Sequence, residues 1–498
     1  MRWVIRIFLG LAALLLAALA WLGVPATGAG MAAKNLCSGV FVAGRAPAEV
    51  LADDVLPASA LLQLVGTVVD QEARLVRGRL LWSPERVAML LPGLGCVLDP
   101  SATLVQAARA TAAAAATAAA AAAPRAGETL APPAGGGAMP SAAADAAAAS
   151  LTEAEGDGID RAAVAAVVED AFMDTGAAAG RNTRAVVVLH RGRLLAERYA
   201  PGFDAGTPQL GWSMSKTVLG LLVYMKLQEQ HRDASVAAFD WVTQERRPRW
   251  LQEWSGDSRR TITLADLLFM RDGLAHREGY QPWSAVPRML WGVDDVPAYA
   301  GSAPAEAPAG ERLRYLSATT NILSRLLRAQ FDSDEAYWNY PAQALFDPIG
   351  ATSAVLESDP NGTFIASSYL WATPLDWARI GQVLLQDGVI GDHRVFPPGW
   401  LQFASNPPPA ADAAALGYGA HVWLPGAGGD SACGPGHRLP PDTLLMSGHA
   451  GQVTAVVPSR EAVIVRLGMT LDRSRFDRCA FVRSVLAALP PGSGSSLR

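Results

Sequence analysis

The sequence predicts an α+β fold for residues 156–490, in which an antiparallel sheet flanked by helices carries a helical insertion. Two apolar, β-rich runs at 185–190 and 194–199 open this region, and the Arg-Gly-Arg turn between them indicates a hairpin. Two more strand-like runs lie near its end, at 454–457 and 462–467. Because helical spacing fills most of the region between them, we expect the N- and C-terminal segments to complete one sheet.

Three segments are expected before this domain. Residues 1–30 resemble a signal peptide or membrane anchor, since Arg2 and Arg6 precede an uncharged apolar run at 7–24. We therefore expect an extracytoplasmic protein, periplasmic or secreted, with the run 7–24 either cleaved or retained as an anchor in the inner membrane.

The two segments that follow differ sharply in composition. Residues 31–105 predict a small β-rich unit, with strand-like runs at 62–69, 73–82 and 87–91. Residues 106–155 are rich in Ala, Pro and Gly without an amphipathic face, which is typical of a linker that is helical in part at most.

The overall composition limits the classes of partner that the protein is expected to bind. A formal net charge of -5 over 498 residues gives no field that would recruit nucleic acid, so a small-molecule ester, amide or peptide-like substrate is favoured. No Cys or His spacing typical of a metal site occurs, and we expect no cofactor.

Four cysteines would meet an oxidising compartment after export, and they allow three pairings. We favour Cys37 with Cys96 and Cys433 with Cys479, because each pair closes a loop within one unit. Free buried thiols are the alternative.

Lysine is rare in this chain. Only Lys34, Lys216 and Lys226 occur among 41 Lys and Arg residues. Compositional drift accounts for Lys34 and Lys226. Lys216 stands in Ser213-Met-Ser-Lys216, just before the helical spacing of 217–227, and one helical turn brings its amine within reach of the Ser213 hydroxyl. A buried lysine with a lowered pKa can accept the proton of a serine nucleophile.

Two further elements carry candidate site residues. Tyr315 lies two residues before Ser317, with Asn321 four residues further on, and a tyrosine beside a cation such as Lys216 can relay a proton. The segment 448–452 runs straight into a strand and contains His449, Gly451 and Gln452. Its small residues would let a ligand approach the backbone, and the N–H groups of Gln452 and Ser213 could form an oxyanion hole. Packing roles are the ordinary alternative for Tyr315 and His449.

Taken in order, these three elements resemble the serine β-lactamase and penicillin-binding-protein superfamily, and more closely its esterase-like (class C-related) and 6-aminohexanoate-dimer hydrolase-like branch. The segments 262–274, 376–381, 384–388 and 399–400 also look like this family, and the unit 37–99, with 93–96 near its end, is similar to the leader of some exported members. The resemblance implies a β-lactamase/transpeptidase-like fold, Ser213 as the acylated residue, Lys216 as base and Tyr315 as relay. It implies supporting roles for Ser317 and His449.

One departure affects the expected activity. Where many β-lactamases have Lys-Thr-Gly on the strand, this chain has His449-Ala-Gly451, and the lost charge would otherwise hold a substrate carboxylate. We therefore expect a serine hydrolase that cleaves esters or amides faster than β-lactams. D-Ala-D-Ala carboxypeptidase or β-lactamase activity and a non-catalytic cell-wall sensor remain as alternatives. An α/β-hydrolase is disfavoured, because residues 211–215 lack the last glycine of G-x-S-x-G.

Overall fold

The computed structural model describes Trp3, Cys433 and residues 22–122, 158–176, 179–230, 251–408, 417–425 and 439–492. The apolar run 7–24 therefore lies almost entirely outside the described residues. Among the helices that are described, none has the length and apolar character needed to cross a membrane.

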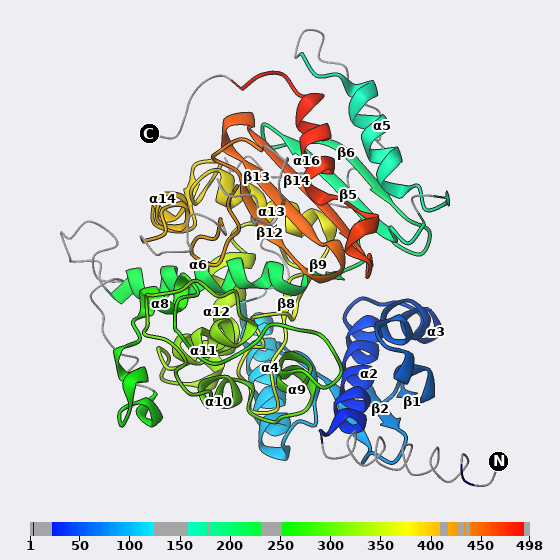
Figure 1. Ribbon diagram of the computed structural model, residues 1–498, viewed down its shortest axis with the longest axis vertical. Helices are drawn as coiled ribbons and strands as arrows, with labels where there is room; N and C mark the ends of the chain where they lie inside the picture. The colour runs from blue at the N-terminus through cyan, green and yellow to red at the C-terminus, as the bar shows by residue number, and fades with distance from the viewer. Residues whose placement is uncertain are drawn as a thin grey trace.

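A five-stranded antiparallel sheet forms the upper layer of the molecule (Figure 1). Its strand order is β12-β13-β14-β5-β6. The strands are β5 (Thr183–His190), β6 (Arg193–Tyr199), β12 (Leu444–Ser447), β13 (Val453–Val457) and β14 (Ala462–Gly468). The expected single sheet of N- and C-terminal segments is confirmed.

Both faces of this sheet are covered, because its central strands alternate between two apolar cores. On β5, Val186 and Val188 pack under α5 (Arg161–Phe172) and α16 (Arg478–Ala487), whereas Val187 and Leu189 face the larger core on the other side. Helix α13 (Pro374–Leu385) packs on that second face.

The helical insertion forms the lower layer of Figure 1. Its long helices are α6 (Ser215–Gln230) and α11 (Ser317–Arg328), which contact each other in the large core. The shorter elements of the domain are α8 (Leu264–Leu268), α9 (Ala285–Trp291), α10 (Val296–Gly301), α12 (Asp334–Pro341), α14 (Trp400–Ser405), a small sheet of β7 (Gln209–Leu210), β9 (Leu370–Ala372) and β8 (Val355–Leu356), and the hairpin β10 (Val389–Ile390) with β11 (His393–Arg394). Of these, α14 lies beside the five-stranded sheet in Figure 1.

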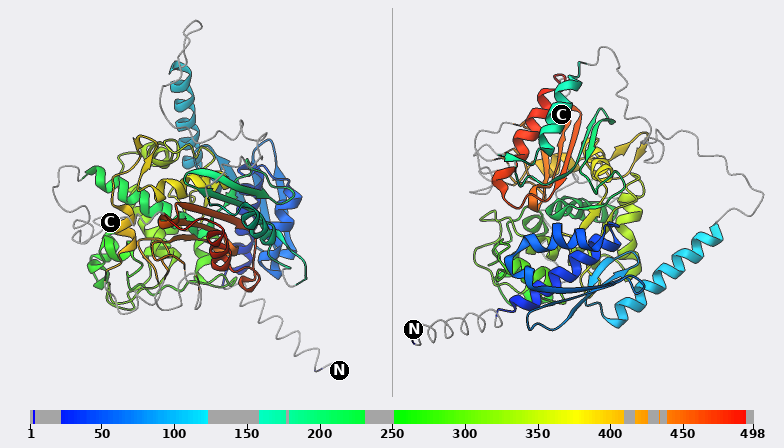
Figure 2. Two further views of the ribbon diagram at one scale, coloured as in Figure 1. Left: turned by 90° about the horizontal axis from the view of Figure 1, so that it is seen from above. Right: turned by 90° about the vertical axis from the view of Figure 1, so that its right-hand side faces the viewer.

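The N-terminal unit packs against the helical layer (Figure 2). Its antiparallel sheet contains β1 (Val65–Asp70), β2 (Leu75–Leu80), β3 (Arg86–Leu91) and β4 (Gly95–Leu98). The helix α2 (Val24–Phe41) lies across this sheet and reaches α9, and the short α3 (Pro47–Val50) follows it.

The helix α2 begins seven residues before the boundary expected at 31. Gly78 explains how it packs so closely, since a Cβ at this position would lie 2.7 Å from the carbonyl oxygen of Ala29. Helix α4 (Ala102–Ala122) occupies the start of the expected linker, and residues 123–157 lie outside the described residues.

Both favoured disulfides are confirmed. Cys37 on α2 is bonded to Cys96 on β4, and Cys433 is bonded to Cys479 on α16. Each bond ties together segments of one unit, and the first fixes the helix of the N-terminal unit to its sheet.

Lys34 has a specific role that compositional drift does not explain. Its side chain is fully buried, and its Nζ lies 3.1 Å from the Oε2 of Glu357 in the helical layer. The amine also donates to the Cys96 carbonyl at 2.5 Å. Burial lowers the pKa of Lys34, and Glu357 opposes this effect. The N-terminal unit is thus joined to the rest of the molecule by a buried ion pair.

Candidate active site

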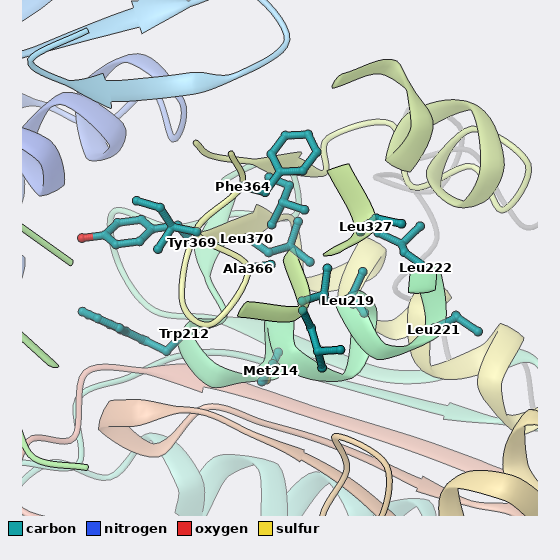
Figure 3. Packing of buried hydrophobic residues seen from close by; sticks show 14 of the residues in the cluster. Trp212, Met214, Leu219, Leu221, Leu222, Leu327, Phe364, Ala366, Tyr369 and Leu370 are labelled. Carbon is teal, nitrogen blue, oxygen red and sulfur yellow. The ribbon is translucent and has the colours of Figure 1, made fainter. Parts of the chain in front are cut away.

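Ser213 lies in a tight turn that leads into α6, at the junction of the two layers. The turn is a short 3-10 helix (Trp212–Met214), and Trp212 adopts a left-handed φ of 50°. Gly211 is required just before it, because a Cβ there would lie 2.1 Å from the indole of Trp377. In Figure 3, Trp212 and Tyr369 point to the same side, towards the ribbons of the N-terminal unit. The turn thus places Ser213 at the start of a helix and directs its neighbour Trp212 towards the unit at the N terminus.

Lys216 contacts the Ser213 hydroxyl, as the S-x-x-K spacing predicts. Its Nζ lies 3.1 Å from Ser213 Oγ and 3.0 Å from Ser317 Oγ, and it donates to the Ser367 carbonyl at 2.8 Å. The side chain is buried, and this desolvation lowers the pKa of Lys216 to about 8, although Glu278 acts in the opposite direction. All three partners are neutral oxygens, so the site accommodates an amine that has lost its proton.

Ser317 links Lys216 to a carboxylate. Its Oγ lies 2.7 Å from Oε1 of Glu278, and its N–H donates to Oε2 of the same residue at 2.8 Å. Ser317 is the first residue of α11, so its N–H has no acceptor inside that helix and Glu278 supplies one. Glu278 is partly exposed, and the chain of contacts therefore leads from the buried amine towards solvent.

Two tyrosines, Tyr315 and Tyr280, lie near enough to Ser213 for this residue to act on their pKa values. Desolvation raises the pKa of Tyr315 above its usual value and Glu278 adds to this, while Ser213, Arg478 and Arg473 act weakly in the other direction. Lys216 Nζ lies 5.0 Å from the Tyr315 ring. The expected cation is present, but the phenol remains protonated. Tyr315 can therefore relay a proton only by accepting one as it gives up its own.

His449 packs against Trp212 of the nucleophile turn and against Tyr280. Its ring stacks on Tyr280 with a centroid distance of 4.5 Å and meets Trp212 edge-on at 5.2 Å. Burial, with a smaller effect of Arg473, lowers the pKa of His449 to about 4. The imidazole is thus neutral near pH 7, and His449 does not replace the charge of a strand lysine.

The small residues around His449 serve packing rather than ligand approach. A Cβ on Gly448 would lie 2.2 Å from the Gly211 carbonyl, so this glycine brings the end of β12 against the nucleophile turn. Gly451 has a φ of 84°, and a Cβ there would lie 2.6 Å from Nη1 of Arg466. The expectation of an open backbone at Gly451 is therefore wrong, because the Arg466 guanidinium fills that space.

At the candidate site, the backbone N–H of Gln452 is available, whereas its side-chain amide is not. Its amide is held by β14, with Nε2 donating to the Gly468 carbonyl at 2.5 Å and Oε1 accepting from the Gly468 N–H at 2.9 Å. Within the described residues, the N–H groups of Gln452 and Ser213 donate to no protein acceptor. These are the two donors that the sequence predicts for an oxyanion hole.

Asn321 acts through the backbone that holds Lys216. It is fully buried on α11, and its Oδ1 accepts from the Ser367 N–H at 3.2 Å. Because the Ser367 carbonyl is an acceptor of Lys216, Asn321 positions this partner and is not itself beside the nucleophile.

Sequence reasoning missed Glu278, Tyr280, Ser367 and Arg473. The first two lie in a connection without periodicity, between α8 and α9, and no spacing relates them to Ser213. Arg473 is exposed in the segment after β14, and it lies near enough to His449 and Tyr315 to affect both pKa values.

Comparison with known proteins agrees with this fold. A search of curated proteins finds no match. Solved structures with similar folds include a putative 6-aminohexanoate-dimer hydrolase from Bacillus anthracis (21% identity, 62% of this chain and 81% of that chain covered, TM-score 0.48). A penicillin-binding protein homologue from Caulobacter crescentus (16%, 66% and 98%, 0.45) and a family VIII carboxylesterase (14%, 66% and 95%, 0.46) are also similar. The Beta-lactamase family model matches residues 165–486, which is more than half of the chain. The predicted fold class is thus confirmed, and the chain belongs to the Beta-lactamase family.

Proposed function

We propose that the protein is an exported serine hydrolase that cleaves a carboxylic ester or amide through a Ser213 acyl-enzyme. The observation that carries this proposal is the 3.1 Å contact between Lys216 Nζ and Ser213 Oγ, made by a buried amine whose pKa is lowered to about 8. A serine hydroxyl becomes an effective nucleophile when such a base takes its proton.

In the acylation step, Ser213 Oγ attacks the substrate carbonyl carbon and its proton passes to Lys216. The N–H groups of Ser213 and Gln452 are proposed to bind the oxyanion, which would supply about 3 kcal/mol of stabilisation per donor. As the bond to the leaving group breaks, Lys216 returns the proton through the Tyr315 hydroxyl to the leaving oxygen or nitrogen. The free enzyme's protonation state is thereby restored.

Deacylation uses the same groups. A water molecule attacks the Ser213 ester, Lys216 accepts its proton, and the proton then passes to Ser213 Oγ as the carboxylic acid leaves. Glu278 stabilises protonated Lys216 through Ser317, so it favours the intermediate state in which the amine carries the proton.

The nucleophile can be tested with a fluorophosphonate, intact-mass spectrometry and peptide mapping. We expect one adduct, on Ser213, and none in Ser213→Ala protein. The matched control is Ser302→Ala, since Ser302 is exposed and bonds only to the Tyr299 carbonyl among the described residues. Full labelling or full p-nitrophenyl ester turnover in Ser213→Ala protein would refute the proposal.

We also propose that the chain is exported, by cleavage of the run 7–24 or with that run as an anchor. Two disulfides support this, because such bonds persist in oxidising compartments. Fractionation of cells that express the full chain tests it, and recovery of the reduced protein in the cytoplasm would contradict it.

A D-Ala-D-Ala carboxypeptidase is the second candidate. It needs a cation for the substrate carboxylate near His449, and Arg473 is placed there, close enough to lower the pKa of His449. Turnover of acyl-D-Ala-D-Ala peptides compared with neutral esters separates the two activities.

A further inference from the structure

A cavity of about 240 Å³ lies between the N-terminal unit and the candidate active site. One wall is formed by Trp212, Tyr280 and His449, which surround the nucleophile turn. The opposite wall comes from α2 and from the segment that follows α3, including Met31 and Ala58. The cavity therefore exists only because the N-terminal unit covers this side of the site.

The interior of the cavity is apolar. Aliphatic and aromatic side chains dominate both walls, among them Leu62 and Leu80 of the N-terminal unit. Two carboxylates also contribute to the lining, but Asp54 is paired with both Arg45 and Arg184, and Asp53 is paired with Arg45 at 2.8 Å. Their charge is compensated, so the cavity favours an uncharged, apolar occupant.

The cavity opens beside the nucleophile. Trp212 directly precedes Ser213 in the chain, and the Tyr280 ring meets the Trp212 ring edge-on at a centroid distance of 6.3 Å. Tyr280 also stacks on His449, so the aromatic wall continues without interruption from the nucleophile into the cavity. The part of the substrate that reaches this cavity would be the group attached to the carbonyl carbon that Ser213 attacks.

We propose that this cavity binds the acyl chain of the substrate, and that the N-terminal unit sets the chain length. The assignment rests on the proposed acyl-enzyme function. A cavity of about 150 Å³ is enough for benzene, so in proportion this one holds about eight to ten carbons. The substrate class is then an ester or amide of a medium-length apolar acid.

A series of p-nitrophenyl esters with acyl chains of two to twelve carbons tests the assignment, because the leaving group stays constant. Burial of each methylene should raise kcat/KM about threefold to fourfold until the cavity is full, at about eight to ten carbons. Longer chains should show no further gain.

The variant Ala58→Trp should shorten this optimum. Ala58 is exposed at the cavity wall, so a large ring can occupy the space without disturbing the core. We expect the octanoate ester to lose at least tenfold in kcat/KM relative to the acetate ester. Ala60→Trp is the matched control, because Ala60 is equally exposed but does not line the cavity.

The outcomes separate the two proposals. Acetate turnover and fluorophosphonate labelling of Ser213 report on the acyl-enzyme alone, and their absence would overturn both. If they are present but kcat/KM does not rise with chain length, or Ala58→Trp and Ala60→Trp behave alike, only the acyl-binding assignment is overturned.

Discussion

The protonation of Lys216 should set the pH dependence of the enzyme. A pKa of about 8, lowered from 10.5 by burial, leaves about one tenth of the amine neutral at pH 7 and about nine tenths at pH 9. With the unshifted value, only about 0.03% would be neutral at pH 7, so burial gives about 300-fold more of the reactive form at a cost of about 3 kcal/mol. We therefore expect kcat/KM for a neutral acetate ester to rise about tenfold from pH 7 to pH 9 and then level off.

Replacement of Glu278 provides an independent check on this assignment. Its carboxylate raises the pKa of Lys216, so Glu278→Gln should move the midpoint of the profile to lower pH and increase kcat/KM at pH 7. Glutamine keeps an acceptor for the Ser317 N–H, and the plateau at high pH should remain. The assay is kcat/KM between pH 6 and pH 10 for both proteins at one ionic strength. A flat profile, a midpoint above pH 10, or a shift to higher pH in Glu278→Gln would refute the role of neutral Lys216.

Three further substitutions have defined outcomes. Lys216→Met should abolish ester turnover yet raise the free energy of unfolding by up to about 3 kcal/mol at pH 7. Because the folded pKa lies below the unfolded one, this gain should fade between pH 8 and pH 10.5, and denaturant unfolding at both ends of that range checks the sign. Lys34→Met should lower the free energy of unfolding by about 3–5 kcal/mol, since Glu357 is left buried without its cation. The double variant Lys34→Met/Glu357→Gln should recover most of this loss, and equal stability of the single and double variants would contradict the prediction. Arg473→Ala should raise KM about two- to tenfold for peptides with a free carboxylate and leave KM for neutral esters unchanged; the effect is modest because Arg473 is exposed and its charge is screened by solvent. An equal effect on both kinds of substrate would remove the basis for the carboxypeptidase candidate.

Two of the contacts that sequence reasoning predicts correctly are determined by local geometry. Ser213 and Lys216 lie one turn apart at the start of a helix, so their contact follows from the helical repeat alone. The strand pair around the Arg-Gly-Arg turn is similar, because a hairpin fixes its own register. In both cases the interacting residues are close in the sequence.

The contacts that sequence reasoning missed depend on segments brought together by packing. Glu278 reaches Ser317 over 39 residues, and Lys34 meets Glu357 over more than 300. Neither pair has a periodic signal, since each partner lies in a different unit or connection. The early start of α2 was missed for a related reason. Its small residues have no clear apolar face, and their burial depends on the close approach that Gly78 permits.

The two buried lysines show why residue type alone does not determine chemistry. Lys34 and Lys216 are equally inaccessible to water, and burial lowers the pKa of both. Lys34 contacts a carboxylate at 3.1 Å, which stabilises its ammonium form and makes it a structural link. Among the described residues, Lys216 donates hydrogen bonds only to hydroxyl and carbonyl oxygens, and the Ser317 hydroxyl lies between it and the Glu278 carboxylate. The amine can therefore lose its proton before acylation and hold a proton during acylation. A carboxylate in direct contact would favour the ammonium so strongly that Ser213 would lack a base.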